Sequence, residues 1–539
     1  MSPTQTFQFQ RKGFWTVGLT LFMVAYNVSV IPAIMPAIVA DLNTSVGSIQ
    51  TILVLFSLVT ASFAPTVENL CRFYGRTPVF LTGLIFYGIG IGLTVLSPSL
   101  GVLAVSFSLI TGLAATPLIS TPWTVVDLFC KGKIGEQATL MLIVASALGG
   151  LSGALLGGFI GSQLSWRWAF VPSLPVLILV WMLKRSLPNL ANHSEQPIDW
   201  VGGLLSFLGL GSILTGVGLS VEFGWWEPKR LFSIAGVVLP PFAISIAPTL
   251  IAVGMILMGF FIFWQRRQAN QSKASLLRGG LLRKRGFVLG MLASMMHTLI
   301  VTGVQFNLFQ FVPIALLLNP FRTALTIIPY NLSTIIVVVV TLRILSLGDR
   351  FSPKYVVYSG IGFLGVGIVV LHRSLYSQIT SLQLMPGLII MGVGSGLFLA
   401  CISRLTYSFA SEDEKPEACG IYNPVQDLGS SLGRDILGTA LISFASRDIV
   451  DNIVENMGQT LSIGDRNQLI AQLQEMIQTL SRQEVKQALL NKLPSSMEPL
   501  IHSISLEAAT SGMQTSLLIA LVFTAICFLL ATTLPKDTS

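Results

Sequence analysis

Long apolar stretches, separated by short polar or charged segments, run along most of the chain. A helix that crosses the hydrocarbon core of a bilayer needs roughly 20 mainly apolar residues. The pattern predicts an all-α polytopic membrane protein with fourteen transmembrane helices. The apolar stretches fall at 14–40, 48–67, 78–97, 101–129, 138–160, 169–183, 200–221, 231–264, 286–310, 323–345, 355–371, 382–405, 420–445 and 513–534.

The stretch at 231–264 differs from the others because three prolines interrupt it. They are Pro240, Pro241 and Pro248. Proline removes a helical hydrogen bond and clashes with the preceding turn. We therefore expect either a kinked helix or a helix accompanied by a re-entrant piece.

Composition supports a membrane protein. Of the 539 residues, 52% are hydrophobic and only 10% are charged, whereas soluble domains carry about 25% charged residues. Soluble enzymes and nucleic-acid-binding modules are therefore excluded. The sequence has no phosphate-binding loop, no His-Glu-xx-His zinc motif and no Gly-x-Ser-x-Gly nucleophile elbow. We predict no enzymatic activity, no catalytic residue and no cofactor or metal site.

The distribution of positive charge predicts an orientation. An even number of helices places both termini on one side. If that side is the cytoplasm, the short inner segments carry about 21 Lys and Arg and the short outer segments about five, as the positive-inside rule requires. The net charge of +8 needs no anionic partner to explain it. We expect an integral protein of a bacterial cytoplasmic membrane with both termini in the cytoplasm.

An internal repeat predicts two bundles of six helices. Leu148–Gly153 resembles Leu428–Gly433, and the loop 72–76 lies at nearly the same offset as the loop 349–354. Transporters are commonly built from such duplicated bundles. The predicted units are an N-terminal bundle (1–185), a linker with two inserted helices and a basic loop (186–285), helices 9–13 (286–445), an outer amphipathic cap (446–511), and helix 14 with a short tail (512–539).

The predicted cap is the one long polar part of the chain. Its apolar residues recur at helical spacing, as in Leu469, Ile470, Leu473, Ile477 and Leu480. Two roles remain open for it, a structural lid and a docking surface for a partner.

Glycines at intervals of four residues mark the helix at 138–160. They are Gly149, Gly153 and Gly157, followed by Gly158. Small residues at this spacing form a groove that lets helices approach and slide. The glycines resemble the antiporter motif of the major facilitator superfamily, in its fourteen-helix branch of drug:proton antiporters, with Ala154 where proline is usual. The segment Trp166–Phe170 also resembles that family.

The resemblance implies gating and coupling residues, and several differ here. Asn27 stands where proton-coupled members carry an aspartate, and Ser108 where they carry an arginine. The gating loop between helices 2 and 3 keeps its glycine and its second arginine but has lost its aspartate and its first arginine, so a charge contact there would have to be rebuilt through Glu68. The residues concerned are Glu68, Arg72, Gly75 and Arg76, with Asp349 and Arg350 in the second half. These differences argue against ordinary proton antiport through the N-terminal half.

Charge is retained inside one predicted helix of the C-terminal half. Asp427, Arg434 and Asp435 lie in the helix at 420–445. Ionisable groups within a bilayer cost at least roughly 2.5–3.5 kcal/mol each and are functional candidates. Asp427 and Arg434 share a helix face about 10 Å apart, with Ser431 between them. Either this face lines a central cavity that binds protons or solute, or it forms an ion-pair network with a neighbouring helix.

Other polar and aromatic residues are candidates for the same cavity. His297 and Gln305 lie within the helix at 286–310. A membrane histidine can carry protons or can join two helices. Tyr26 and Trp123 offer aromatic faces to a hydrophobic or cationic ligand.

These features predict a secondary transporter that works by alternating access near the bilayer midplane. The family resemblance implies export of a small amphipathic or hydrophobic solute, with proton coupling atypical or lost. Two alternatives remain: an uncoupled facilitator of a neutral or anionic solute, and a transport-inactive receptor or assembly partner. The expected partners are the lipid bilayer, a small solute and protons, with no nucleic acid, and the expected state is a monomer.

Overall fold

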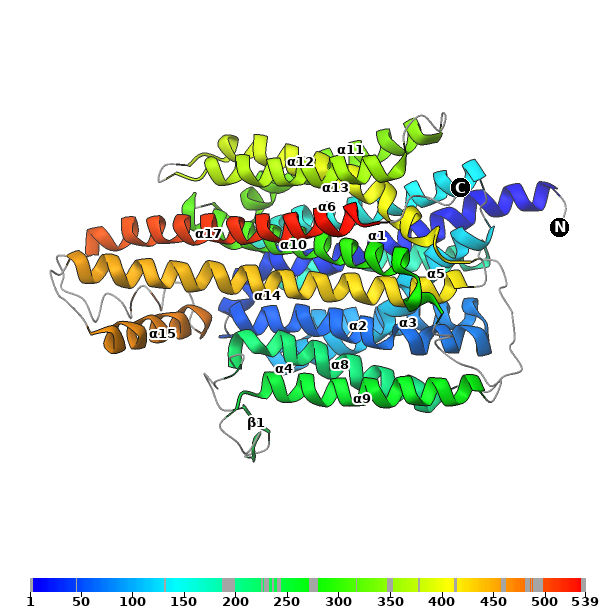
Figure 1. Ribbon diagram of the computed structural model, residues 1–539, viewed down its shortest axis with the longest axis horizontal. Coiled ribbons are helices and arrows are strands. Elements are labelled where there is room, and N and C mark those ends of the chain that lie inside the picture. The colour runs from blue at the N-terminus through cyan, green and yellow to red at the C-terminus, as the bar shows by residue number, and fades with distance from the viewer. Residues whose placement is uncertain are drawn as a thin grey trace.

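The computed structural model is a long helical bundle (Figure 1). It describes residues 3–44, 46–129, 132–186, 199–223, 226, 232–234, 237–239, 244–270, 280–316, 318–346, 352–376, 379–411, 414–456, 462–479, 485, 487 and 498–534. Helix α1 begins at one end of the bundle, which we call the terminal end. Helix α15 lies at the opposite end, which we call the far end.

The first bundle contains the helices before residue 187 and has its own apolar core. That core includes Phe80, Tyr87 and Phe107, which are fully buried. Its elements are α1 (Pro3–Asp41), α2 (Val46–Tyr74), α3 (Arg76–Val95), α4 (Leu100–Leu103), the π-helix η1 (Ala104–Thr111), α5 (Gly112–Phe129), α6 (Gly132–Gln163), the short 3-10 helices η2 (Trp166–Phe170) and η3 (Leu183–Ser186), and α7 (Ser173–Met182).

The second bundle has a separate apolar core, which includes Met391, Phe398 and Leu517. Its elements are η4 (Leu281–Arg283), α10 (Arg285–Ala315), α11 (Pro320–Ser346), α12 (Pro353–Arg373), α13 (Ser381–Tyr407), α14 (Lys415–Asn456) and α17 (Glu498–Thr532). Two bundles with one core each agree with the predicted duplication. The bundles touch mainly along two seams, α2 with α14 and α6 with α11, and α1 and α5 add smaller contacts.

Two further helices, α8 (Trp200–Phe223) and α9 (Ile246–Asn270), pack against each other between the bundles in sequence. In Figure 1 they lie along one edge, with α8 next to α2. The prediction of one kinked helix over 231–264 is wrong, whereas the alternative of a helix with a re-entrant piece stays a prediction. Residues 232–239 include two short antiparallel strands, β1 (Phe232–Ile234) and β2 (Val237–Leu239), and α9 begins only at Ile246. Pro248 fits within the first turn of α9, where its missing N–H costs nothing.

Eleven helices among the described residues are long and apolar enough to cross a membrane, so the chain is an integral membrane protein. Two shorter apolar helices cover Trp166–Met182 and Trp200–Gly216. Helix α14 is 42 residues long but more polar than the eleven candidate membrane-spanning helices. The count of fourteen transmembrane helices stays a prediction.

The polar region near the far end is built partly from the neighbouring helices. Helix α14 continues to Asn456 and α17 starts at Glu498, with α15 (Ile463–Thr479) between them. Ile449, Leu473 and Ile504 belong to a small apolar cluster that joins the three helices. The cap limits of 446–511 stay a prediction, since the helices cross both of them without a break.

Asp451 and Arg466 fasten α15 to α14 beside this cluster. Arg466 donates two hydrogen bonds of 2.6 Å to the carboxylate of Asp451. These bonds hold the pKa of Asp451 below its usual range.

Candidate functional site

Helix pairs α1–α6 and α10–α14 approach each other in the same way, and glycines make the approach possible. A Cβ atom added to Gly149 or Gly153 would collide with the carbonyl oxygens of Phe22 and Tyr26 on α1. A Cβ atom on Gly429 or Gly433 would collide with those of Met295 and Leu299 on α10. In both bundles, two glycines four residues apart therefore meet two carbonyls four residues apart. The glycines matched in sequence also match in space. Gly157 and Gly158 are buried on the same helix.

The glycine contacts orient α14 and therefore its charges. Successive residues are about 100° apart around a helix. Ser431 and Asp435 lie two residues after Gly429 and Gly433, so they point to the side of α14 that faces away from α10. Arg434 confirms this direction, because its Nη2 donates a 3.3 Å hydrogen bond to Ser57 Oγ on α2. We call Asp427, Ser431, Arg434, Asp435 and Thr439 the charged face of α14.

Several buried atoms of the charged face have no hydrogen-bond partner within the described part of the chain. They are Ser431 Oγ, Arg434 Nε, Asp435 Oδ2 and Thr439 Oγ1. A buried polar group without a partner costs about 1–3 kcal/mol, so folded proteins usually satisfy it or use it. Four such atoms on one face of one helix suit a site that binds water, protons or a polar solute.

The carboxylates of the charged face are not neutralised by close ion pairs. Among the described residues, no basic nitrogen lies within 4.0 Å of Asp427 or Asp435. Asp427, Arg434 and Asp435 are each half-buried. The opposite charges therefore share one region without locking together, which leaves them able to exchange partners.

The N-terminal candidates bond within their own bundle instead. Asn27 is fully buried, and its Nδ2 donates to Tyr87 Oη on α3 at 3.0 Å. Tyr26 donates to the Ala169 carbonyl at 2.8 Å. Ser108 donates to the Ile52 carbonyl at 2.7 Å. The structure thus does not bring these residues together with the charged face, and their roles in transport stay predictions. Trp123 is half-buried against the first core.

His297 joins helices of the C-terminal bundle. Its Nε2 lies 3.2 Å from Ser395 Oγ on α13, and its ring stacks on Phe398 at 4.3 Å. Tyr330 on α11 donates to the same Ser395 hydroxyl at 3.0 Å. This geometry favours the helix-joining role over proton carriage. Gln305 is half-buried on α10.

The first predicted gating loop contains a buried ion pair. Arg76 donates two hydrogen bonds, of 3.0 and 2.7 Å, to the carboxylate of Glu68. Gly75 has a φ of 87°, in the region that favours glycine, and lets α3 begin directly after α2. Arg72 is exposed. Glu68 thus pairs with the arginine that the loop retains, and its replacement of the lost aspartate stays a prediction. Asp349 and Arg350 lie outside the described residues.

Sequence reasoning missed the residues that complete the polar surroundings of α14. Sequence analysis could not single out Ser57, because it is one serine among the apolar residues of its helix. Ser294 on α10 accepts hydrogen bonds from Tyr422 Oη at 2.8 Å and Gln426 Nε2 at 2.5 Å. Gln426 could have been found from its place beside Asp427, whereas Ser57 and Ser294 carry no signal that separates them from other small membrane residues.

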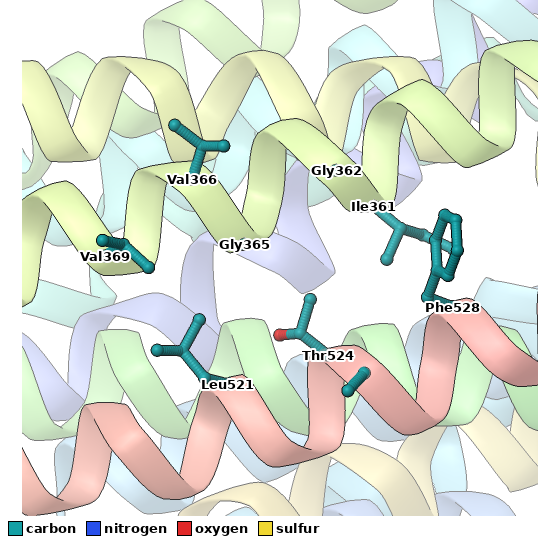
Figure 2. Close-up of a pocket in the computed structure, with 9 residues that line it drawn as sticks. Ile361, Gly362, Gly365, Val366, Val369, Leu521, Thr524 and Phe528 are labelled. Atoms are coloured by element: carbon teal, nitrogen blue, oxygen red, sulfur yellow. The ribbon is translucent and has the colours of Figure 1, made fainter.

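A groove of about 410 Å³ lies elsewhere, between α12 and α17 (Figure 2). Figure 2 shows Val366, Val369, Leu521 and Phe528 along its walls, with Thr524 as its one polar side chain. Thr524 already donates to the Ala520 carbonyl at 2.8 Å. An apolar groove without a free polar group cannot bind a charged solute, so it is not the candidate site.

Comparisons with known proteins agree with this architecture. Solved structures that share the fold include the human organic anion transporter MFSD10 (TM-score 0.56, 12% identity, 98% of this chain and 100% of that one). A bacterial homologue of the human lysosomal transporter Spinster, in an inward-facing and unoccupied conformation, is also similar (TM-score 0.54, 13% identity, 100% of both chains).

Relatives in sequence are bacterial transport proteins. A protein named "Probable actinorhodin transporter" from Streptomyces coelicolor is 25% identical over 412 residues, which cover 75% of this chain and 68% of that one. The multidrug resistance protein Stp of Mycobacterium tuberculosis is 24% identical over 435 residues (80% and 75%). The model of the Major Facilitator Superfamily matches residues 17–433. The chain therefore belongs to the Major Facilitator Superfamily of membrane transporters.

Proposed function

We propose that this protein is a secondary transporter that exports a small amphipathic or hydrophobic solute by alternating access. The charged face of α14 would supply the proton- or solute-binding groups. The observation that carries the proposal is the position of this face, which points at the other bundle and holds four buried polar atoms that have no hydrogen-bond partner among the described residues. A group at the boundary between two moving bodies can change its partners as they move.

The chemistry divides between the two charge types. Asp427 and Asp435 can each gain and lose a proton, and either can attract a cationic solute. Arg434 stays charged and can serve as counter-charge or as an anion ligand. The multidrug resistance protein Stp and the multidrug efflux pump LfrA of Mycolicibacterium smegmatis, which is 21% identical over 431 residues, support export of drug-like solutes.

A second candidate is an uncoupled facilitator of a neutral or anionic solute. It is favoured by Arg434 on the charged face and by Asn27, whose buried amide cannot titrate. Proton dependence separates the two candidates.

The test measures efflux of a fluorescent lipophilic cation from cells that express the protein, with and without a protonophore. We expect protein-dependent efflux that the protonophore abolishes and that Asp427→Asn or Asp435→Asn removes. Asp448→Asn, a change in the same helix near its far end, is the matched control and should keep efflux. Efflux that survives the protonophore favours the facilitator. No efflux of any tested cationic, neutral or anionic solute, with the protein correctly inserted, contradicts transport and favours a receptor.

A further inference from the structure

Helix α8 packs against α2 beside the α2–α14 seam, which we call the charged seam because the charged face of α14 lies there. Thr66 Oγ1 on α2 donates to the Gly203 carbonyl on α8 at 3.3 Å. The rings of Phe63 and Phe207 meet edge to face with centroids 6.2 Å apart. Helix α8 is therefore attached to α2 at two points along its length.

Leu214 completes this cover where α2 meets α14. It is 3% exposed and belongs to a cluster with Val54, Leu58 and Ala61 of α2. Leu428 of α14 packs against the same cluster. Ser57, the partner of Arg434, lies on α2 within one turn of these residues. An apolar layer contributed by three helices thus lies beside the charged face.

The α8–α9 hairpin is held as one unit. Asp199 accepts hydrogen bonds from the Gly202 amide at 2.8 Å, from Trp264 Nε1 at 2.9 Å and from Gln265 Nε2 at 2.8 Å. It therefore caps the start of α8 and binds the last part of α9 at once. Glycines on both helices allow the close approach, since a Cβ atom added to Gly216 would lie only 2.7 Å from the Ala247 carbonyl oxygen on the opposite helix. The α8–α9 hairpin is therefore a single, tightly packed unit, and we call its surface beside α2 and α14 the wall.

Outward-facing apolar side chains show which helices meet the bilayer. Among the described residues with large exposed apolar side chains, α2 contributes only Tyr74, at its end, and α14 contributes none. Helices α6 and α11 contribute many, and so do α8 and α9. They are Leu148, Leu156 and Phe159 on α6; Leu325, Leu332, Ile336, Val340 and Ile344 on α11; Trp200, Val201, Leu204 and Leu208 on α8; and Val253, Met255, Ile256, Phe260, Ile262 and Phe263 on α9.

We propose that the α8–α9 hairpin insulates the charged face of α14 from the bilayer, and that Leu214 and Phe207 are the residues that close this wall. Charged groups that face lipid are costly, and they are retained where protein or water surrounds them. The hairpin lies between lipid and the outer surfaces of α2 and α14, so its own apolar side chains face the lipid in their place. The α6–α11 seam, which carries no such charges at the equivalent helix positions, is left to face lipid directly.

The test maps lipid contact without using transport. The full-length protein is reconstituted with a phospholipid that carries a photoreactive diazirine on its acyl chain, irradiated, and digested for mass spectrometry. We expect peptides of α6, α8, α9 and α11 to be labelled about tenfold more than the membrane parts of α2 and α14, the ratio that about 1.4 kcal/mol in lipid occupancy would give.

Variants of the wall give the decisive comparison. Leu214→Ala and Phe207→Ala should each raise labelling of α2 and α14 several-fold. Leu204→Ala, on the lipid side of the same helix at 59% exposure, is the matched control and should leave it unchanged. Equal labelling of α2 and α11 in the unmodified protein would overturn the proposal. So would unchanged labelling of α2 and α14 in both wall variants. Neither result depends on whether the protein transports a solute.

Discussion

The two seams between the bundles are equivalent in the internal repeat, yet they differ in charge and in cover. Along the α2–α14 seam, Arg434 reaches Ser57 across the boundary, and α8 packs over the seam. Along the α6–α11 seam, Phe159 meets Phe321 edge to face with centroids 5.7 Å apart. The α2–α14 seam has both a charged residue and a covering helix pair. Among the described residues, the α6–α11 seam has neither. The comparison teaches that a membrane helix can keep ionisable groups at a seam when another helix pair separates them from lipid.

The glycine contacts beside both seams predict a large loss of stability. Gly153→Ala and Gly433→Ala would each push a methyl group into a carbonyl oxygen of the facing helix. We expect each change to lower the free energy of unfolding by about 1–3 kcal/mol or more. Thermal unfolding in detergent would measure it. Gly362→Ala is the control, because a Cβ atom there has nothing within 4 Å. If only one of the two buried variants were destabilised, the bundles would not be equivalent at these glycines.

Moving a charge to the uncovered seam tests the comparison directly. The repeat places Ala154 on α6 where Arg434 lies on α14. Ala154→Arg should cost about 2.5–3.5 kcal/mol on insertion, because no hairpin in the described part of the chain covers this seam. The yield of folded protein in the membrane should fall, and Ala154→Leu should preserve it. Normal yield and stability for Ala154→Arg would show that the seams do not differ in their tolerance of charge.

The hydrogen bond between Arg434 and Ser57 predicts a smaller effect. Ser57→Ala removes this bond, which is worth about 0.5–1.5 kcal/mol net. We expect the initial rate of efflux to fall a few-fold, because Arg434 loses the group that orients it. Ser62→Ala is the matched control on α2, since Ser62 bonds only to the Leu58 carbonyl of its own helix among the described residues. Equal rates for the two variants would remove Ser57 from the site.

Acid should loosen the far end of the charged seam, where α15 contacts α2. Arg466 lowers the pKa of Asp451 in the folded protein. Its stabilising contribution is therefore complete above the ordinary aspartate pKa of about 3.9 and is lost as the pH falls toward the lowered value. The effect should be small, because the side chains are 41% and 46% exposed.

Hydrogen exchange of the α15 amides at pH 7 and near the acid limit would measure this loosening. Exchange relative to the rest of the protein should rise on acidification. Asp451→Asn should already show faster exchange at pH 7 and should lose most of the pH dependence. A pH response that persists in this variant would assign it to another group.

Much of the architecture could be predicted from local sequence. Hydropathy located most of the helices, because a membrane helix must be apolar along its own length. The glycine repeat indicated two equivalent bundles, and the structure confirms that Gly149 and Gly429 meet backbone in the same way. The short strands at 232–239 were missed because a brief apolar segment looks alike in a strand and in a helix.

The candidate site could be predicted only in part. The rarity of charge within the apolar stretches singled out Asp427, Arg434 and Asp435, since each such group is costly in a bilayer. The sequence could not tell which neighbour they face. It grouped Asn27 with them, yet Asn27 bonds to Tyr87 inside the first bundle. It also gave no sign of Ser57, which lies 377 positions from Arg434.

The sequence by itself determined the membrane class, the bundle repeat and the identity of the charged helix, because these depend on the composition and spacing of single segments. The tertiary structure decided that the charged face of α14 points at α2, and that the α8–α9 hairpin covers this seam and leaves the α6–α11 seam uncovered. Those facts depend on which helices become neighbours. In a chain whose helices are nearly all apolar, hydrophobicity does not select the neighbour; close packing and a few hydrogen bonds do.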